Sequence, residues 1–262
     1  MCIPWRPSPT RLKPHDAVRR YWEENFPDWP VIESDSDTKI FNLSQARNNA
    51  CRQADTDVVV FCDADTIPPT ESVKIAVENP VGITWPHKVW RLIPAEYADR
   101  PFNEFPKART LVEYAGGLGG VMVCTVEEYW RIGGQPEEFE GWGHEDRAFH
   151  MVATTLSTFR RIAGIAYSVE HNERLRVADT PEWHRDSRRN ADIVRPYEVA
   201  NGNPDLMREL IKIRNEGREK GVDWRSRFGA NETDPVHHKL FFTEPGKNTP
   251  PSGSDWKKRW YQ

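Results

Sequence analysis

The chain has 262 residues and a formal net charge of −4, from 36 Lys and Arg against 40 Asp and Glu. That length suits one large α/β domain or a catalytic domain with a tail, and the slight acidic excess argues against a protein that binds nucleic acid over its whole surface. No apolar stretch is long enough to cross a membrane and the N-terminus has no hydrophobic signal core, so we expect a cytoplasmic protein. The four cysteines lack metal-type spacing and are expected to be reduced.

The first third of the chain alternates predicted strands with predicted helices. Strands are expected over residues 1–6, 31–35 and 58–62, and helices over 17–26 and from the N-cap Ser44 through Cys51. Arg6, Asp35 and Asp37 then stand at the carboxyl ends of the first two strands. This βαβ rhythm predicts an α/β sheet flanked by helices.

The rest of the chain is less regular. Further helices are expected over residues 71–78, 147–155 and 205–220, and strands over 81–85, 121–124 and 164–169. Residues 86–114 are rich in Pro, Arg and aromatic side chains and are interpreted as long loops. Thr125 and Glu128 predict a capping box for a helix that ends at Gly133 and Gly134. Past Glu173 the composition becomes polar and basic, which predicts a domain over 1–175 and a partly helical extension over 176–262.

Two carboxylates follow the apolar run Val58–Cys62 in the sequence Asp63-Ala64-Asp65. Alternation along a strand brings both to the carboxyl edge of the sheet, where open α/β folds bind ligands. A hard divalent cation such as Mg²⁺ or Mn²⁺ needs only one or two such carboxylates when substrate phosphates complete its shell. The pattern predicts a metal-diphosphate site, and its alternative is a solvated turn, where a short Asp-x-Asp is also common.

A second acidic motif, Gly141-Trp142-Gly143-His144-Glu145-Asp146, lies further along the chain. Glu145 and Asp146 are adjacent, so their side chains diverge in any regular conformation and are expected to do different jobs. One of them is expected to take the proton of a weakly nucleophilic hydroxyl as a general base. The alternative is an acidic pair that the helix dipole stabilises, and the two interpretations are compatible because a helix start is a rigid mount.

The order of these motifs resembles the GT-A family of glycosyltransferases. The tryptophan-glycine-acidic element is similar to that of the galactosyltransferase and polypeptide N-acetylgalactosaminyltransferase branches. The resemblance covers about residues 1–172 and is carried by segments 3–6, 42–48, 63–66, 133–134 and 141–146 and by His171. It implies a GT-A-like, Rossmann-like mixed sheet flanked by helices.

The resemblance also implies a site for a nucleotide sugar and its metal. The residues expected at the nucleotide sugar are Arg6, Asp35, Asp37, Arg47, Asp63, Gly119 and Trp142. Asp65 is expected to be the firmest metal ligand, together with Asp63 and His171, and an imidazole ligand favours Mn²⁺ over Mg²⁺. The alternative for His171 is a surface or hydrogen-bonded histidine. The glycine run 116–120 allows close approach of the backbone to the donor sugar.

By the same resemblance, Asp146 is the general base and Glu145 binds the acceptor, while His144 receives no role. Trp142 stands between two glycines and is expected to move as part of a lid, with ordinary core packing as the alternative.

The predicted function is metal-dependent transfer of a hexosyl or N-acetylhexosaminyl group from a UDP-sugar to an acceptor hydroxyl. By resemblance to soluble bacteriophage glycosyltransferases, the acceptor is 5-hydroxymethylcytosine in phage DNA, and the enzyme would then act in the host cytoplasm. A protein or glycan acceptor is the alternative. Cations and aromatic rings of the kind found in nucleic-acid grooves occur at Arg185, Arg188, Arg189 and residues 256–260, although most such runs are solvated.

Two other classes of protein use a similar site. A nucleotidyltransferase also works on a metal-bound diphosphate, and a non-catalytic module would hold the nucleotide sugar without transferring it. Retention and inversion at the anomeric carbon are both open, because the two branches that the chain resembles differ in this respect.

Overall fold

The protein is built on a six-stranded mixed sheet with the strand order β2-β1-β3-β8-β5-β9. The computed structural model describes residues 1–141, 143–171 and 181–220, with side chains from 188 onward in the last range. The strands are β1 (Cys2–Pro4), β2 (Ile32–Ser34), β3 (Val58–Cys62), β5 (Ile83–Trp85), β8 (Val121–Thr125) and β9 (Phe159–Arg161). Neighbouring strands are parallel except at β8, which is antiparallel to β3 and β5. The predicted mixed α/β fold is confirmed.

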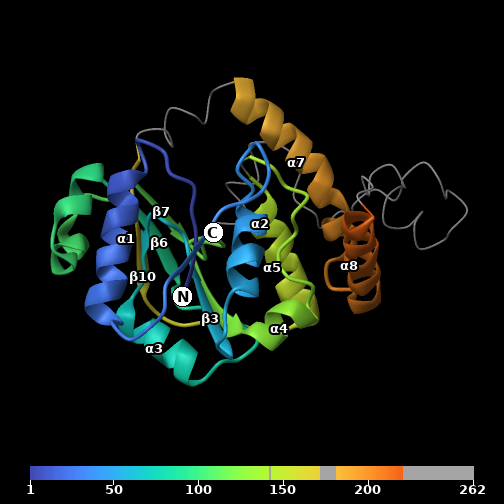
Figure 1. Cartoon of the computed structure of the whole chain (residues 1–262), viewed down its shortest axis with the longest axis horizontal. Coiled ribbons are helices and arrows are strands. Elements are labelled where there is room, and N and C mark those ends of the chain that lie inside the picture. The colour runs from blue at the N-terminus through green and yellow to red at the C-terminus, as the bar shows by residue number, and fades with distance from the viewer. Residues whose placement is uncertain (142, 172–180, 221–262) are drawn as a thin grey trace, which may run out of the picture.

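Helices cover both faces of this sheet (Figure 1). The helices α1 (Leu12–Asn25) and α3 (Thr70–Glu78) pack on one face, and α2 (Leu43–Arg52), α4 (Val126–Arg131) and α5 (Glu145–Leu156) pack on the other. Strand β3 serves both layers because its side chains alternate. Val59 and Phe61 belong to the core beneath α2 and α5, whereas Val60 and Cys62 belong to the core beneath α1 and α3.

A second sheet lies beside the first, in the order β4-β10-β6-β7. Its strands are β4 (Thr66–Ile67), β6 (Val89–Ile93), β7 (Val112–Ala115) and β10 (Ile165–Val169), and the 3-10 helices η1 (Ala95–Asp99) and η2 (Phe102–Lys107) lie between β6 and β7. The interpretation of residues 86–114 as long loops is therefore wrong. Strand β6 pairs in parallel with β10, with Val89 opposite Ile165. Because this partner is distant in the sequence, no local pattern near β6 predicts the pairing.

Two helices follow the described part of the second sheet. Helix α8 (Pro204–Glu219) was predicted, but α7 (Pro181–Ala200) was not. Along α7 the apolar side chains Ile193, Val194 and Tyr197 are buried against the α5 layer, and Pro196 within the helix weakens the local signal. In Figure 1, α7 lies above α5, and α8 lies to the side of α5. The division into domains 1–175 and 176–262 stays a prediction.

Smaller differences concern helix starts. Asn42, not Ser44, is the N-cap of α2, because its Oδ1 accepts from the amide N of Gln45 at 2.9 Å. The side chain of Thr125 caps α4 through the amide of Glu128, as predicted. Helix α1 begins five residues before the predicted start at residue 17, since a proline such as Pro14 is tolerated in a first turn.

All four cysteines are buried and free of disulfides. Within the described ranges, no helix combines the length and the apolar character needed to span a bilayer.

Candidate active site

The site is organised around Arg47, a buried guanidinium on α2. Its Nη2 donates to Oδ1 of Asp63 at 2.5 Å, and its Nη1 donates to Oδ1 of Asp146 at 2.8 Å and to Oε1 of Gln135 at 3.1 Å. One side chain thus joins the acid at the end of β3 to the acid in the first turn of α5. Although burial alone would lower it, the two carboxylates raise the pKa of Arg47. The structure brings together three residues that were predicted separately.

Asp63 is fixed on its other side by the glycine run. Its Oδ2 accepts from the amide N of Gly120 at 3.1 Å, and its own amide donates to the Gly120 carbonyl at 2.8 Å. Burial raises the pKa of Asp63, against the opposing effect of Arg47. The contact with Arg47 means that this carboxylate is anchored to the protein on both sides.

Gly119 forms the wall between the two acids. A Cβ atom there would lie 2.5 Å from Oδ2 of Asp146 and 3.8 Å from Oδ2 of Asp63. A side chain at this position would therefore have to displace the Asp146 carboxylate. The backbone at Gly119 lies close to the two carboxylates, while its predicted close approach to the donor sugar stays a prediction.

Replacement of Gly119 by Ala is expected to lower the activity of the site by about 10²-fold, because the methyl group must displace Asp146 by about 1 Å. Steady-state rates of the variant and the parent protein measure this. Gly202→Ala is the control, since Gly202 has a φ of 75° but open space around it. Activity of Gly119→Ala within about threefold of the parent would show that the gap between the acids is not needed.

Asp65 and His171 form a second pair at the edge of the site. Nε2 of His171 lies 3.4 Å from Oδ2 of Asp65, while Oδ1 of Asp65 accepts from the Thr66 hydroxyl at 2.9 Å. The amide of Val169 donates to the Asp65 carbonyl at 2.8 Å, so the end of β10 is held beside β4. This pairing of strands explains how His171, far away in the sequence, reaches Asp65.

The Asp65–His171 pair fits a divalent cation. A carboxylate oxygen and an imidazole nitrogen form a donor set that suits Mn²⁺. His171 is buried, and its Nδ1 has no hydrogen-bond partner among the described residues. No group of three or more His, Cys, Asp or Glu is gathered for a metal within residues 1–141, 143–171 and 181–220. Asp63 is paired with Arg47. Asp63 as a metal ligand stays a prediction.

Glu145 and Asp146 begin α5 and have different surroundings, as predicted. Glu145 is buried, and its Oε2 has no hydrogen-bond partner in the part of the chain that the structure describes. Burial and the neighbouring Asp146 raise the pKa of Glu145 to about 8, so its carboxyl is mostly protonated at neutral pH. Asp146 keeps 27% of its side chain exposed. Of the two, Asp146 has the surroundings that a base requires.

Arg6 and Asp35 meet at the carboxyl ends of β1 and β2. The Arg6 Nε lies 2.8 Å from Oδ2 of Asp35, and its guanidinium also donates to the carbonyls of Ser36, Thr38 and Lys39. The cation lies 5.5 Å from the ring centre of Phe41, a residue that the sequence analysis missed. Its position just before Asn42, the N-cap of α2, was the sequence signal that could have identified Phe41. Arg6 therefore shapes a loop that ends in an aromatic surface.

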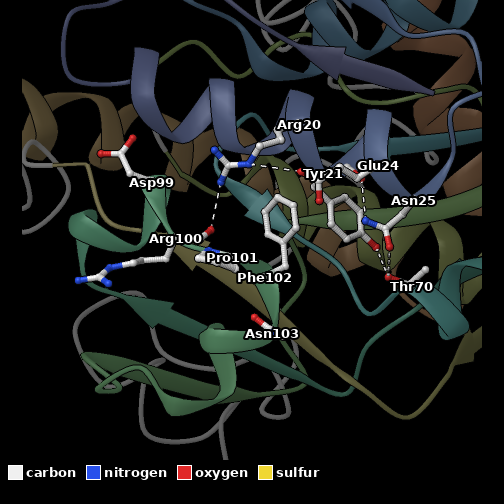
Figure 2. A pocket seen from close by; sticks show the side chains of 10 residues that line it. All are labelled: Arg20, Tyr21, Glu24, Asn25, Thr70, Asp99, Arg100, Pro101, Phe102 and Asn103. Atoms are coloured by element: carbon white, nitrogen blue, oxygen red, sulfur yellow. Dashed lines mark hydrogen bonds and ion pairs between the residues drawn. The ribbon is translucent and has the colours of Figure 1, made fainter.

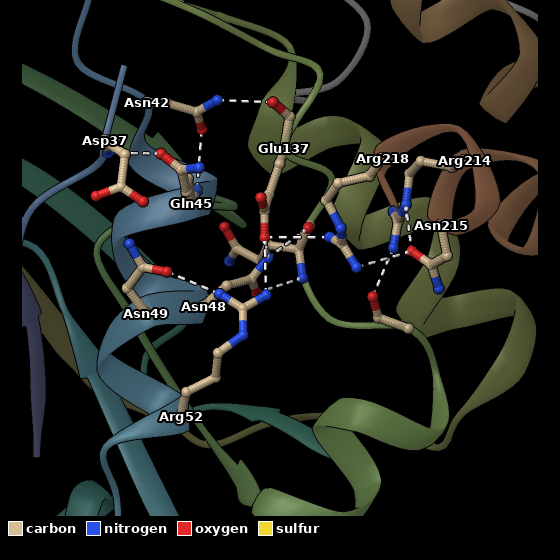
Figure 3. Close-up of polar contacts among 12 residues, drawn as sticks. Asp37, Asn42, Gln45, Asn48, Asn49, Arg52, Glu137, Arg214, Asn215 and Arg218 are labelled. Atoms are coloured by element: carbon tan, nitrogen blue, oxygen red, sulfur yellow. Dashed lines mark hydrogen bonds and ion pairs between the residues drawn. The ribbon is translucent and has the colours of Figure 1, made fainter. Parts of the chain in front are cut away.

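The other predicted site residues either lie away from the site around Arg47 or fall outside the residues that the structure describes. Asp37 is exposed, and its backbone amide donates to the Gln45 side chain at 2.8 Å (Figure 3). Trp142 and residues 256–260 lie outside the described residues, as does the side chain of Arg185. Arg188 is exposed, whereas Arg189 bonds to Glu140. The described residues give the predicted nucleic-acid surface no further support.

A pocket of about 580 Å³ lies elsewhere on the molecule, between α1, the start of α3 and the η1–η2 segment (Figure 2). Phe102 occupies its centre, between Arg20 and Tyr21. None of its lining residues belongs to the site around Arg47.

The mixed sheet carries two acids after β3, and they face an acidic pair at the start of α5, an order of motifs that resembles the GT-A glycosyltransferases. Residues 23–79 match the family model "Glycosyl transferase family 2", and residues 99–172 match "N-terminal domain of galactosyltransferase". The first range contains Arg47, Asp63 and Asp65, and the second contains Glu145 and Asp146. The predicted enzyme class, a glycosyltransferase, is confirmed by both matches.

Solved structures of glycosyltransferases are also similar to this chain. Drosophila β1,4-galactosyltransferase 7 with manganese, UDP-Gal and xylobiose is 16% identical over 61% of this chain and 62% of that chain, with a TM-score of 0.41. S. aureus TarS in complex with UDP is 14% identical over 88% of this chain and 74% of that chain, with a TM-score of 0.45. The matched part thus spans less than two thirds of the galactosyltransferase structure. No curated protein sequence matches the chain.

Proposed function

We propose that this protein transfers a hexosyl or N-acetylhexosaminyl group from a UDP-sugar to an acceptor hydroxyl with the help of Mn²⁺ or Mg²⁺. The proposal is carried by one observation: Arg47 holds Asp63 and Asp146 on either side of the side-chain-free wall at Gly119. In this proposal Asp63 is the donor-side acid and Asp146 is the acceptor-side acid, and one guanidinium holds both.

The donor side has groups for each part of a nucleotide sugar. The ring of Phe41, with Arg6 and Asp35 beside it, offers a stacking surface and polar groups for the base and ribose. Asp65 and His171 would hold the cation, which when bound neutralises negative charge on the leaving diphosphate. Gly119 lets the sugar approach the backbone.

On the acceptor side, Asp146 takes the proton of the acceptor hydroxyl. The oxygen forms a bond to the anomeric carbon, the bond between that carbon and the diphosphate oxygen breaks, and UDP leaves with the electron pair. The protonated carboxyl of Glu145 can donate a hydrogen bond to the acceptor. Arg47 keeps the Asp146 carboxylate oriented while leaving its second oxygen for the hydroxyl.

The test is release of UDP from a panel of UDP-sugars with Mn²⁺. Asp65→Ala is expected to lower release by more than about 10²-fold, because the charge on the leaving group is then poorly neutralised. Chelation of the metal should have the same effect on the parent protein. Asp205→Asn, a change at a side chain that is 95% exposed, serves as the control and should leave the rate unchanged.

The same assay separates the acceptors and the alternative functions. Stimulation by xylobiose or another glycan indicates a glycan acceptor, and stimulation by DNA that contains 5-hydroxymethylcytosine indicates the DNA acceptor. Pyrophosphate in place of UDP would identify a nucleotidyltransferase. A donor that binds without any release would identify a non-catalytic module and refute transfer.

A further inference from the structure

We propose that Asn190 of α7 is a positioning residue that holds the loop from which Glu145 and Asp146 begin. The inference rests on the proposed function and adds to it a role for the C-terminal helices. Neither the motifs nor the matched ranges, which end at residue 172, include this residue.

The loop backbone before α5 has a conformation that needs support. Gly141 and Gly143 have φ values of 72° and 101°, and His144 has a φ of 74°. His144 is the one residue other than glycine with a positive φ in the described part of the chain, and this region is costly for a residue with a Cβ. Its side chain makes no capping hydrogen bond, although it is the N-cap of α5. The start of α5 therefore depends on contacts from other elements.

Helix α7 supplies these contacts. Asn190 is fully buried, and its Nδ2 donates to the carbonyl of Glu140 at 3.2 Å and to the carbonyl of Gly143 at 3.0 Å. The neighbouring Arg189 donates to the same Glu140 carbonyl and reaches the Glu140 carboxylate at 3.4 Å. One amide group thus fixes two carbonyls on the two sides of the turn that leads into the acidic pair.

The segments on both sides of this turn are fixed as well. Glu137 Oε1 accepts from Asn48 at 2.6 Å, from Arg52 at 3.2 Å and from Arg218 at 3.1 Å, which ties the loop to α2 and α8 (Figure 3). In the first turn of α5, Arg147 pairs with Glu198 of α7 at 2.6 Å. The entry and the exit of the loop are therefore held, and Asn190 supports the strained part between them.

From this loop, the contacts continue directly to the reacting side chains. The turn sets the position of the first turn of α5, which carries Asp146, and Asp146 bonds to Arg47. A loop that moves by about 1 Å would misplace the carboxylate relative to the acceptor hydroxyl and lower the rate by about 10²-fold. Donor binding depends on Asp65, His171 and the Phe41 region and should change little. A positioning role thus predicts a loss in kcat with an unchanged KM for the donor.

The test uses Asn190→Asp, which keeps the size of the side chain but turns a carboxylate oxygen toward two carbonyls, and Asn190→Ala, which removes the donor. Amide hydrogen exchange is measured over residues 139–148. UDP release with Mn²⁺, from a UDP-sugar that the parent protein hydrolyses, gives kcat and KM separately. We expect exchange to become faster by about tenfold or more, kcat to fall by about tenfold to 10²-fold and KM to stay within about twofold. Thermal unfolding confirms that each variant is folded.

Asn203→Ala is the matched control. Asn203 is the N-cap of α8 and bonds to the amide of Leu206 at 3.1 Å, so its loss weakens the first turn of α8, at the opposite end of the helix from Arg218, which bonds to Glu137. This variant should show parental exchange over 139–148 and parental kcat. Unchanged exchange in both Asn190 variants would overturn the proposal, and so would faster exchange with unchanged kcat. If the parent protein releases UDP from no donor, the proposed function fails, and exchange alone then decides whether Asn190 holds the loop.

Discussion

Replacing Asp146 with Asn is expected to lower the rate of UDP release by about 10²- to 10⁴-fold, the usual contribution of a general base. The amide oxygen of the variant still accepts from Arg47, so the geometry around α2 and α5 should survive. What is lost is the ability to take the acceptor proton. Under the proposed function UDP and its cation bind on the other side of Gly119, so the dissociation constant of UDP measured by titration calorimetry with Mn²⁺ should stay within about threefold.

Glu145→Gln is the comparison that makes this result specific. Since burial raises the pKa of Glu145 to about 8, its carboxyl is mostly neutral at pH 7, and a neutral amide resembles it in charge and shape. We expect a loss of less than about tenfold in this variant. A larger loss in the Glu145 variant would mean that the roles of the two acids are exchanged. Equal losses in the two variants would show that the pair acts only through structure.

The acids of the site could be predicted from the sequence because local pattern was enough. An apolar run as short as Val58–Cys62, bounded by polar residues, is typical of a buried strand, and Asp63 and Asp65 follow directly at its carboxyl end. The helix was predicted from residue 147, with an N-terminal pair as the alternative interpretation of Glu145 and Asp146, and α5 begins at Glu145. In each case the position of the side chain follows from the element that contains it.

The partners of these acids could not be predicted, because pairing depends on the tertiary fold. Periodicity places Arg47 on a helix, yet its two carboxylate partners lie 16 and 99 residues further along the chain. Arg47 was accordingly expected at the nucleotide, and no local pattern connects it with Asp146. The second sheet was missed for the same reason, since the pairing of β6 with β10 cannot be predicted from the sequence of either strand alone.

Helix α7 shows a further limit of local pattern. It contains Pro196, and its charged side chains made the region resemble a solvated tail. The helix forms because α5 offers an apolar surface to Ile193, Val194 and Tyr197. Its contacts with the acidic motif, through Asn190, were therefore invisible at the level of sequence.

Replacing Arg47 with Met is expected to destabilise the protein by about 3–5 kcal/mol at pH 8, because Asp63 and Asp146 would lose their shared counter-charge in a buried site. Denaturant unfolding measures this, and sugar transfer should be lost with it. Without Arg47 the pKa of Asp63, which burial already raises, would rise further above its unfolded value. For an acid with a raised folded pKa, the stability penalty is present above that pKa and disappears as the pH falls toward the unfolded pKa near 4. The deficit of Arg47→Met should therefore shrink between pH 8 and pH 5.

This dependence on pH separates charge from packing. A deficit that is the same at pH 5 and pH 8 would mean that Arg47 contributes through its packing, and the account of Arg47 as the shared counter-charge of Asp63 and Asp146 would be wrong. Arg52→Met is the matched control on the same helix, since Arg52 is 45% exposed in its pair with Glu137 and should cost about 1 kcal/mol or less. Arg47→Lys restores the charge but lacks the fork that reaches both acids, so it should recover stability at pH 8 only in part. Such partial recovery would show that the distance between Asp63 and Asp146, as well as their charge, is set by the guanidinium of Arg47.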